Sequence, residues 1–153
     1  WQQANHALSA QVIMIIVASL ALGSALMKTG GAEYLAQVFL YLTHGISPAW
    51  ILSFLMLLMA IMTNVVSNNA AAVIGTPVAI SIAQELGMPL EPFVLALLFG
   101  ANLSFITPMA YKTNLLVMNA GGYKFNDFVR VGTPLTLLMW LVLSGVLIFA
   151  YRL

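Results

Sequence analysis

The sequence predicts an all-α membrane protein, a polytopic helical bundle with a re-entrant helical hairpin and a broken transmembrane helix. Hydrophobic residues make up 62% of the 153 residues and charged residues only 6%, whereas a soluble domain carries about a quarter charged residues. A chain of this composition has too few polar side chains to cover its surface in water. Cysteine is absent, which excludes a disulfide framework and a thiolate metal site.

Two segments precede the predicted hairpin. Leu8 to Met27 supplies the about 20 apolar residues that a helix needs to cross the hydrocarbon, and Thr29-Gly30-Gly31 ends it. Glu33 to His44 is too short to span, but its polar and apolar residues separate onto two helical faces. That pattern is typical of a helix lying in the membrane interface, and a short packed connector is an equal alternative. The apolar face holds Leu35, Val38, Phe39 and Leu42, and the polar face holds Glu33, Gln37 and His44.

The hairpin is predicted from an uncharged stretch, Ala49 to Gln84, that is interrupted once. Its arms, Ala49 to Val66 and Ala70 to Ala83, flank the polar tip Ser67-Asn68-Asn69. At about 1.5 Å per residue the second arm reaches only roughly 20 Å. We therefore expect both arms to enter and leave on one side of the membrane, with the tip inside it.

The broken helix follows at residues 91–122. Phe93 to Ser104 is apolar and helical in pattern, and Thr107-Pro108 interrupts it. The next residues, up to Asn114, are unusually polar, and Leu115 to Met118 resumes for about one turn. Val131 to Tyr151 is then a full-length uncharged span that ends at Arg152.

The loop charges predict an orientation. The loop before the last span carries Lys124 and Arg130, and the loop after the hairpin carries Glu85 and Glu91. Cytoplasmic loops of membrane proteins are enriched in Lys and Arg. We expect a multi-pass protein of the cell membrane with the basic loop inside and the acidic loop and the C-terminus outside.

Two breaks within apolar runs indicate a ligand site. Irregular backbone at membrane depth is tolerated where it is buried in protein or lines a cavity, and broken helices in transporters offer N-terminal ends to anions and carbonyls to sodium. The alternative is a pair of kinks satisfied by neighbouring helices. Two Asn-containing breaks in one short chain favour the ligand site. The candidate anion contacts are Ser67, Asn68, Asn69, Lys112, Thr113 and Asn114.

Lys112 is the charged residue that lies well inside an apolar run, which makes it a functional candidate. Three roles are open: contact with the anion, an ion pair with another part of the protein, or a side chain that reaches a nearby surface.

We expect no enzyme, because no nucleophile, base and acid come together in the spans. We expect no metal other than sodium, because His6 and His44 lie near segment ends without a second ligand. We also expect no nucleic-acid partner.

Three segments carry a resemblance to a known family. "TNVVSNNAAAVIGTP" resembles the second-repeat hairpin of the divalent anion:sodium symporter family, "ANLSFITPMAYKTN" its second broken helix, and "GGYKFNDFVRVG" the approach to its last span. The family is marked by Ser-Asn-Thr at the tip, and this chain has Asn69 in the third place. The variants "GGYKF" and "AYKTN" resemble more the sulfate-type or unassigned permeases that carry cytosolic regulatory domains between their halves.

The resemblance implies a sodium site and two structural parts, a scaffold and a moving transport unit. Residues 1–48 would be a scaffold helix with an interfacial arm, and residues 49–153 a moving transport unit with its hairpin at 49–86, its broken helix at 91–122 and its last transmembrane helix at 126–152. Sodium would be the coupling ion, with no other cofactor. The residues around the second sodium would be Thr63, Val66, Asn68 and Ala110, mostly through backbone carbonyls, and Thr107 is the further candidate that the second break offers.

These observations lead to one principal hypothesis and two alternatives. The chain is expected to be the C-terminal half of a sodium-coupled secondary transporter for a small divalent anion, sulfate or a dicarboxylate, in a homodimer. It begins with Trp1 and not Met, so we expect the N-terminal repeat of the same polypeptide to precede it. The alternatives are a non-transporting membrane scaffold subunit and an ion antiporter of the same superfamily. A second Ser-Asn-rich hairpin upstream would favour transport over the scaffold.

Overall fold

The structure is a computed structural model that describes residues 10–152, and every regular element in that range is helical. His6 and the first residues of the predicted span, Leu8 and Ser9, lie outside the described residues. The elements are α2 (Ala10–Lys28), α3 (Gly31–Leu42), α4 (Pro48–Val65), α5 (Asn68–Glu85), α6 (Leu90–Asn102), the short 3-10 helix η1 (Pro108–Ala110), α7 (Lys112–Gly121) and α8 (Phe125–Tyr151).

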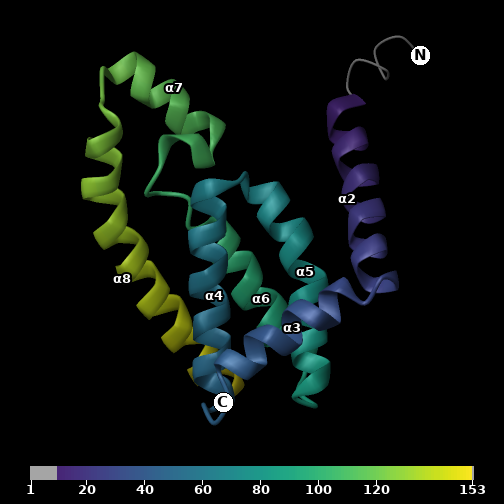
Figure 1. Cartoon of the computed structure of the whole chain (residues 1–153). Helices are drawn as coiled ribbons and strands as arrows, with labels where there is room; N and C mark the ends of the chain where they lie inside the picture. Colours follow the sequence, from purple (N-terminus) through teal and green to yellow (C-terminus); the bar gives the residue numbers. More distant parts are fainter. Residues whose placement is uncertain (1–9, 153) are drawn as a thin grey trace.

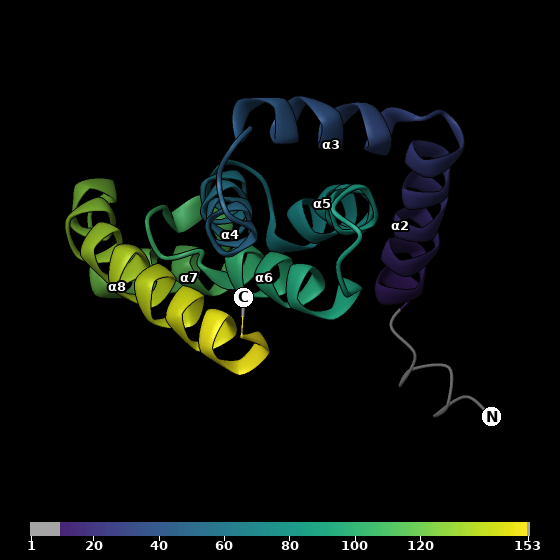
Figure 2. The same ribbon diagram turned by 90° about the horizontal axis from the view of Figure 1, so that it is seen from below.

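Helices α4, α5 and α6 form the centre of the molecule (Figure 1). Seen from below, α8 lies on one flank of this centre and α2 on the other, while α3 crosses beside α4 and α5 (Figure 2). The core consists mainly of apolar side chains from the three central helices, with Phe93, Leu52 and Leu97 fully buried, and α3 and α8 add one buried residue each, Ala36 and Leu147. Two helices of the described part, α4 and α8, are long and apolar enough to cross a membrane by length and composition.

The second arm of the hairpin is longer than the sequence predicted. Helix α5 begins at Asn68 and has 18 residues, the same length as α4, which corresponds to about 27 Å. Although α5 is not among the helices of the described part that are long and apolar enough to cross a membrane, the arm is longer than the roughly 20 Å expected. The reason is local, because the Ser67 side chain accepts a hydrogen bond from the backbone N–H of Ala70 at 3.3 Å. This cap makes Asn68 and Asn69 the first turn of α5.

The second break also differs from the prediction in its limits. Helix α6 ends at Asn102, before Ser104, and α7 has 10 residues that begin at Lys112. The polar residues from Lys112 to Asn114 thus form the first turn of a helix. This helix is longer than the single turn expected from Leu115 to Met118. The irregular backbone is confined to the connection between α6 and η1 and to Tyr111, whose φ of −141° and ψ of 134° are extended.

Helix α3 is present where an interfacial helix or a packed connector was predicted, and it packs mainly through small residues. Its buried residues are Ala32 and Ala36, which face the neighbouring helices with half-buried Phe39 and Leu40. The larger residues Leu35, Val38 and Leu42 are exposed. They line one wall of an apolar groove of about 640 Å³, whose opposite wall includes Leu58 and Val78. Small residues permit the close approach of helices, so they replace the large ones at the contact.

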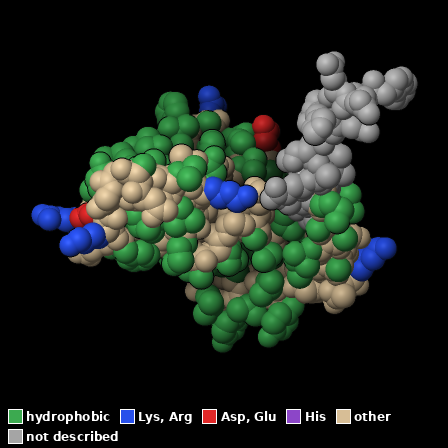
Figure 3. All heavy atoms as spheres, turned by 90° about the horizontal axis from the view of Figure 1, so that it is seen from above, with side chains coloured by type: hydrophobic (Ala, Val, Ile, Leu, Met, Phe, Trp, Pro, Cys, Tyr) green, Lys and Arg blue, Asp and Glu red, His purple; other side chains and the backbone are tan. Residues whose placement is uncertain are grey.

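Polar contacts hold α8 against α4, and a small residue lets α6 pack closely on α4. Trp140 Nε1 on α8 donates to the Ser53 carbonyl of α4 at 2.8 Å, and the Ser53 and Ser144 hydroxyls are 2.9 Å apart. Gly100 on α6 packs directly on the Met56 carbonyl, where a Cβ would collide with backbone. Seen from the end that carries α7, the surface is largely hydrophobic and carries few charged side chains, of which two basic ones and an acidic one gather at one edge (Figure 3). The buried residues of the described part include no charged side chain.

Candidate functional site

The candidate site lies where the hairpin tip meets the connection between α6 and η1. Thr63, in the last turns of α4, is fully buried. Its Oγ1 is 2.7 Å from Asn68 Oδ1 and 2.8 Å from the Ala101 carbonyl oxygen of α6. A threonine hydroxyl has one proton, so it donates fully to one of these two acceptors at a time. Three oxygen atoms therefore share one proton at this point.

Ser104 joins the first turns of two helices. Asn68, the first residue of α5, donates from Nδ2 to Ser104 Oγ at 3.3 Å. Asn114, the third residue of α7, donates from Nδ2 to the Ser104 carbonyl at 2.9 Å. Each helix start carries a partial positive charge, because its first backbone N–H groups have no partner within the helix. Two such ends thus meet at one buried serine.

Asn64 connects α4 to the same stretch of backbone. Its Nδ2 donates to the Leu103 carbonyl at 2.9 Å, and its Oδ1 accepts from the backbone N–H groups of Ile106 at 3.0 Å and Thr107 at 3.1 Å. Thr107 Oγ1 in turn donates to the Asn64 carbonyl at 2.7 Å. The side chain is buried. The irregular backbone of residues 103–107 is therefore held largely by one amide of the hairpin.

The structure brings together five of the residues predicted from the sequence. Thr63, Asn68, Thr107 and Asn114 share the contacts described above, and Ala110 is buried in η1 beside them. The remaining predicted residues lie at the rim. Ser67 and Asn69 are exposed at the tip, Val66 is exposed in extended backbone, and Lys112 and Thr113 are exposed in the first turn of α7. Lys112 makes none of the contacts that build the junction.

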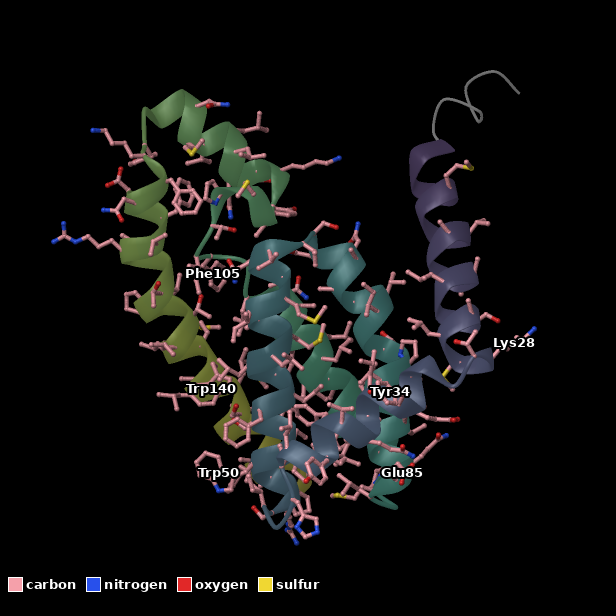
Figure 4. The ribbon with its side chains drawn as sticks, in the orientation of Figure 1. Lys28, Tyr34, Trp50, Glu85, Phe105 and Trp140 are labelled. Carbon is pink, nitrogen blue, oxygen red and sulfur yellow. The ribbon has the colours of Figure 1, made fainter. Side chains whose placement is uncertain are left out.

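Asn64 and Ser104 are the contacts that the sequence prediction missed, together with the carbonyls of Ala101 and Leu103. Asn64 directly follows the predicted Thr63, so its amide within an apolar run was a usable signal. Its partners lie 39 to 43 residues along the chain, which no local pattern indicates. Phe105 marks this region in Figure 4, between α4 and α8 and level with the upper end of α4.

The junction is built from neutral side chains and backbone. Within residues 10–152, no group of three or more His, Cys, Asp and Glu residues comes together. The hydrogen bonds described above involve only hydroxyls, amides and carbonyls. An arrangement of this kind offers oxygen atoms to a hard cation and N–H groups to an anion, and holds no set of groups for proton transfer between a nucleophile and a base.

These features define a helical membrane protein with a polar junction buried among its central helices. Comparison with known proteins gives the family: the citrate transporter family model matches residues 1–153. The chain belongs to this family, consistent with its predicted resemblance to the divalent anion:sodium symporters. It is a family of transporters and not of enzymes, as the sequence predicted.

Individual relatives are also transporters. The chain is 33% identical over 140 residues to an uncharacterized transporter of Synechocystis, covering 92% of this chain and 23% of that protein. It is 33% identical over 130 residues to the transporter YfbS of Escherichia coli, covering 85% and 21%. It is 29% identical over 151 residues to sodium/sulfate cotransporter 1 of Chlamydomonas reinhardtii, covering 98% and 17%. The chain thus spans less than a quarter of the length of each.

Proposed function

We propose that the chain is the C-terminal half of a sodium-coupled secondary transporter for a small divalent anion, with sulfate as the first substrate to test. The observation that carries this proposal is the group of three oxygens at Thr63, Asn68 and Ala101, which share one proton. Similarity to a sodium/sulfate cotransporter supports both the coupling ion and the anion.

The sodium site is proposed at these oxygens. A sodium ion would satisfy the acceptor that the Thr63 hydroxyl leaves without a proton, and oxygen atoms are the ligands that hard cations prefer. Unwound backbone and helix C-terminal ends supply such oxygens in transporters. Ala101 lies in the last turn of α6, and Thr63 and Val66 lie at the end of α4. The carbonyls of Val66 and Ala110, with Thr107, complete the proposed surroundings of the ion.

The anion site is proposed beside the sodium, where α5 and α7 begin. Anions are stabilised at helix N-termini by free N–H groups and by the helix dipole. Asn68 and Asn114 bring both helix starts to Ser104, and the exposed side chains of Ser67, Asn69 and Thr113 lie at the same starts. Lys112 adds a positive charge at the start of α7. One sodium and one anion would then be separated by little more than the Asn68 side chain.

The depth of the tip supports a re-entrant hairpin. In Figure 1 the turn between α4 and α5 lies below the upper ends of α2, α7 and α8. A membrane that covers α2 and α8 would therefore enclose the tip. Both arms of the hairpin return to the end of the molecule where Figure 4 places Trp50 and Glu85. In this arrangement residues 1–48 form the scaffold part and residues 49–153 the transport part, within a homodimer of the longer polypeptide.

The test is equilibrium binding of radiolabelled sulfate to the purified full-length polypeptide across a sodium titration. Asn68→Ala removes a side chain that serves both proposed sites. We expect it to raise the half-saturating concentrations of sodium and sulfate together, while the protein assembles normally. Asn119→Ala changes an exposed amide near the end of α7 and serves as the control, with both values as in the parent.

The other outcomes separate the alternatives. Unchanged affinities and unchanged coupling in Asn68→Ala would make the hairpin tip a packed turn only. Absence of sulfate and dicarboxylate binding in the parent, at any sodium concentration, would favour the scaffold subunit. Sodium flux that needs no anion would favour the antiporter.

A further inference from the structure

The amide of Asn64 makes four hydrogen bonds in a buried position. Besides its three contacts to residues 103–107, its Nδ2 donates to the Ala60 carbonyl of its own helix at 2.7 Å. Two protons and two lone pairs are thus all used. No bonding capacity is left for a ligand, which distinguishes Asn64 from its neighbour Thr63, whose proton is divided between two acceptors.

The three contacts beyond its own helix fix backbone that has no helical partners of its own. The Leu103 carbonyl and the N–H groups of Ile106 and Thr107 lie outside α6 and η1. Without Asn64 these groups would need other partners, and a buried polar group without a partner is costly. The position of residues 103–107 relative to α4 therefore depends largely on the Asn64 side chain, with the Thr107 hydroxyl as a further contact to α4.

Residues next to Asn64 and residues that it holds belong to the two proposed ligand sites. Thr63, one residue before Asn64, contributes an oxygen to the proposed sodium site. Ser104 and Thr107, within the stretch that Asn64 holds, contact Asn114 at the start of α7, where the anion is proposed to bind. A movement of the last turn of α4 would therefore be transmitted by Asn64 to the backbone beneath the anion.

We infer that Asn64 is a positioning residue that couples sodium binding to anion binding without contacting either ion. This inference rests on the proposed function. Sodium would draw the end of α4 together with Asn68 and Ala101, and Asn64 would carry residues 103–107 into the arrangement that fits the anion. Coupling of this kind is reciprocal, so the anion raises the affinity for sodium by the same factor.

The experiment measures the coupling factor directly. In the full-length polypeptide, sulfate dissociation constants are measured without sodium and at saturating sodium, and their ratio is the coupling factor. In Asn64→Ala we expect this ratio to fall to within about threefold of unity, against the roughly 5- to 150-fold typical of coupled sites.

Asn102→Ala is the matched control. The Asn102 Nδ2 also donates to a carbonyl four residues back in its own helix, Leu98, at 2.7 Å, but its side chain is exposed. Its removal should leave the coupling factor as in the parent. If Asn64→Ala fails to assemble, Asn64→Gln replaces it, because the amide is then displaced by one methylene and the same loss of coupling is expected.

The results distinguish this inference from the proposed function. A parent protein without sodium-dependent sulfate binding would overturn both. A coupled parent with an unchanged ratio in Asn64→Ala, or in Asn64→Gln where the first variant does not assemble, would overturn the positioning role alone. The positioning role is likewise overturned if sulfate binds more weakly both without sodium and at saturating sodium while the coupling factor is preserved, because that result describes a purely structural residue.

Discussion

Thr107 and Asn64 are joined by two hydrogen bonds in which Thr107 is the donor: its Oγ1 donates to the Asn64 carbonyl at 2.7 Å, and its backbone N–H donates to Asn64 Oδ1 at 3.1 Å. The carbonyls of the last helical turn have no partner further along their helix. Asn64 lies in the last turn of α4, which ends at Val65. Thr107 therefore completes the end of α4 while Asn64 holds the connection that contains Thr107.

The first prediction concerns the Thr107 hydroxyl. Thr107→Val has nearly the same shape but leaves the Asn64 carbonyl without its donor, so we expect the protein to lose about 1 to 2 kcal/mol of stability. Thr107→Ser keeps the hydroxyl and should behave like the parent. Thermal unfolding of the detergent-solubilised protein measures the difference. Equal transition temperatures for Thr107→Val and the parent would show that the hydroxyl contributes nothing.

The second prediction concerns Lys112, which is exposed in the first turn of α7. A cation there opposes the helix dipole, so stability does not explain its position. Lys112→Met should raise the half-saturating anion concentration about fivefold, which corresponds to about 1 kcal/mol, and leave assembly and unfolding temperature unchanged. Lys124→Met, at the exposed start of α8, is the control. Unchanged uptake would assign Lys112 to a surface role, and loss of folded protein would indicate an ion pair with another part of the protein.

Apolar runs predicted the helices well, because burial in a membrane needs long uncharged segments. They located α4, α5 and α8 and the break after α6. They failed at the limits of the elements, where single hydrogen bonds decide: the Ser67 cap extends α5 back to Asn68. They failed also at Asn64, since its importance comes from partners that lie near it only in the folded chain.

The third prediction concerns membrane orientation. The loop after α5 and the loop before α8 lie at opposite ends of the molecule (Figure 1). Glu85 ends α5 and Glu91 lies in the first turn of α6, on the two sides of the first loop. Lys124 directly precedes α8, and Arg130, predicted to lie in the loop, is in the second turn of α8, because this helix begins at Phe125. All four residues are exposed. Single cysteines at these positions in a cysteine-free background should react with an impermeant thiol reagent in intact cells only at the two glutamate positions. Labelling of the two basic positions alone would reverse the orientation.

The last prediction concerns Gly132, which lets α8 pack directly on the second break. A Cβ at this position would collide with the Phe105 carbonyl, and it would also lie 2.8 Å from the Ile106 Cα. These atoms are backbone, so they cannot turn away as a flexible side chain would. Gly132→Ala must therefore displace α8 or residues 105–106, and forced displacements of this kind typically cost about 1 to 3 kcal/mol.

Gly145→Ala is the control on the same helix, because a Cβ there would meet no atom within 4 Å. Alanine is favoured over glycine in helix interiors by about 1 kcal/mol, so Gly145→Ala should leave stability unchanged or raise it slightly. Gly132→Ala should lower the unfolding temperature and, because Ile106 is held by Asn64, should also weaken sodium-dependent sulfate binding. Loss of stability with intact binding would mean that the contact between α8 and the break serves packing alone. Equal behaviour of the two alanine variants would contradict the close approach of Gly132 to Phe105.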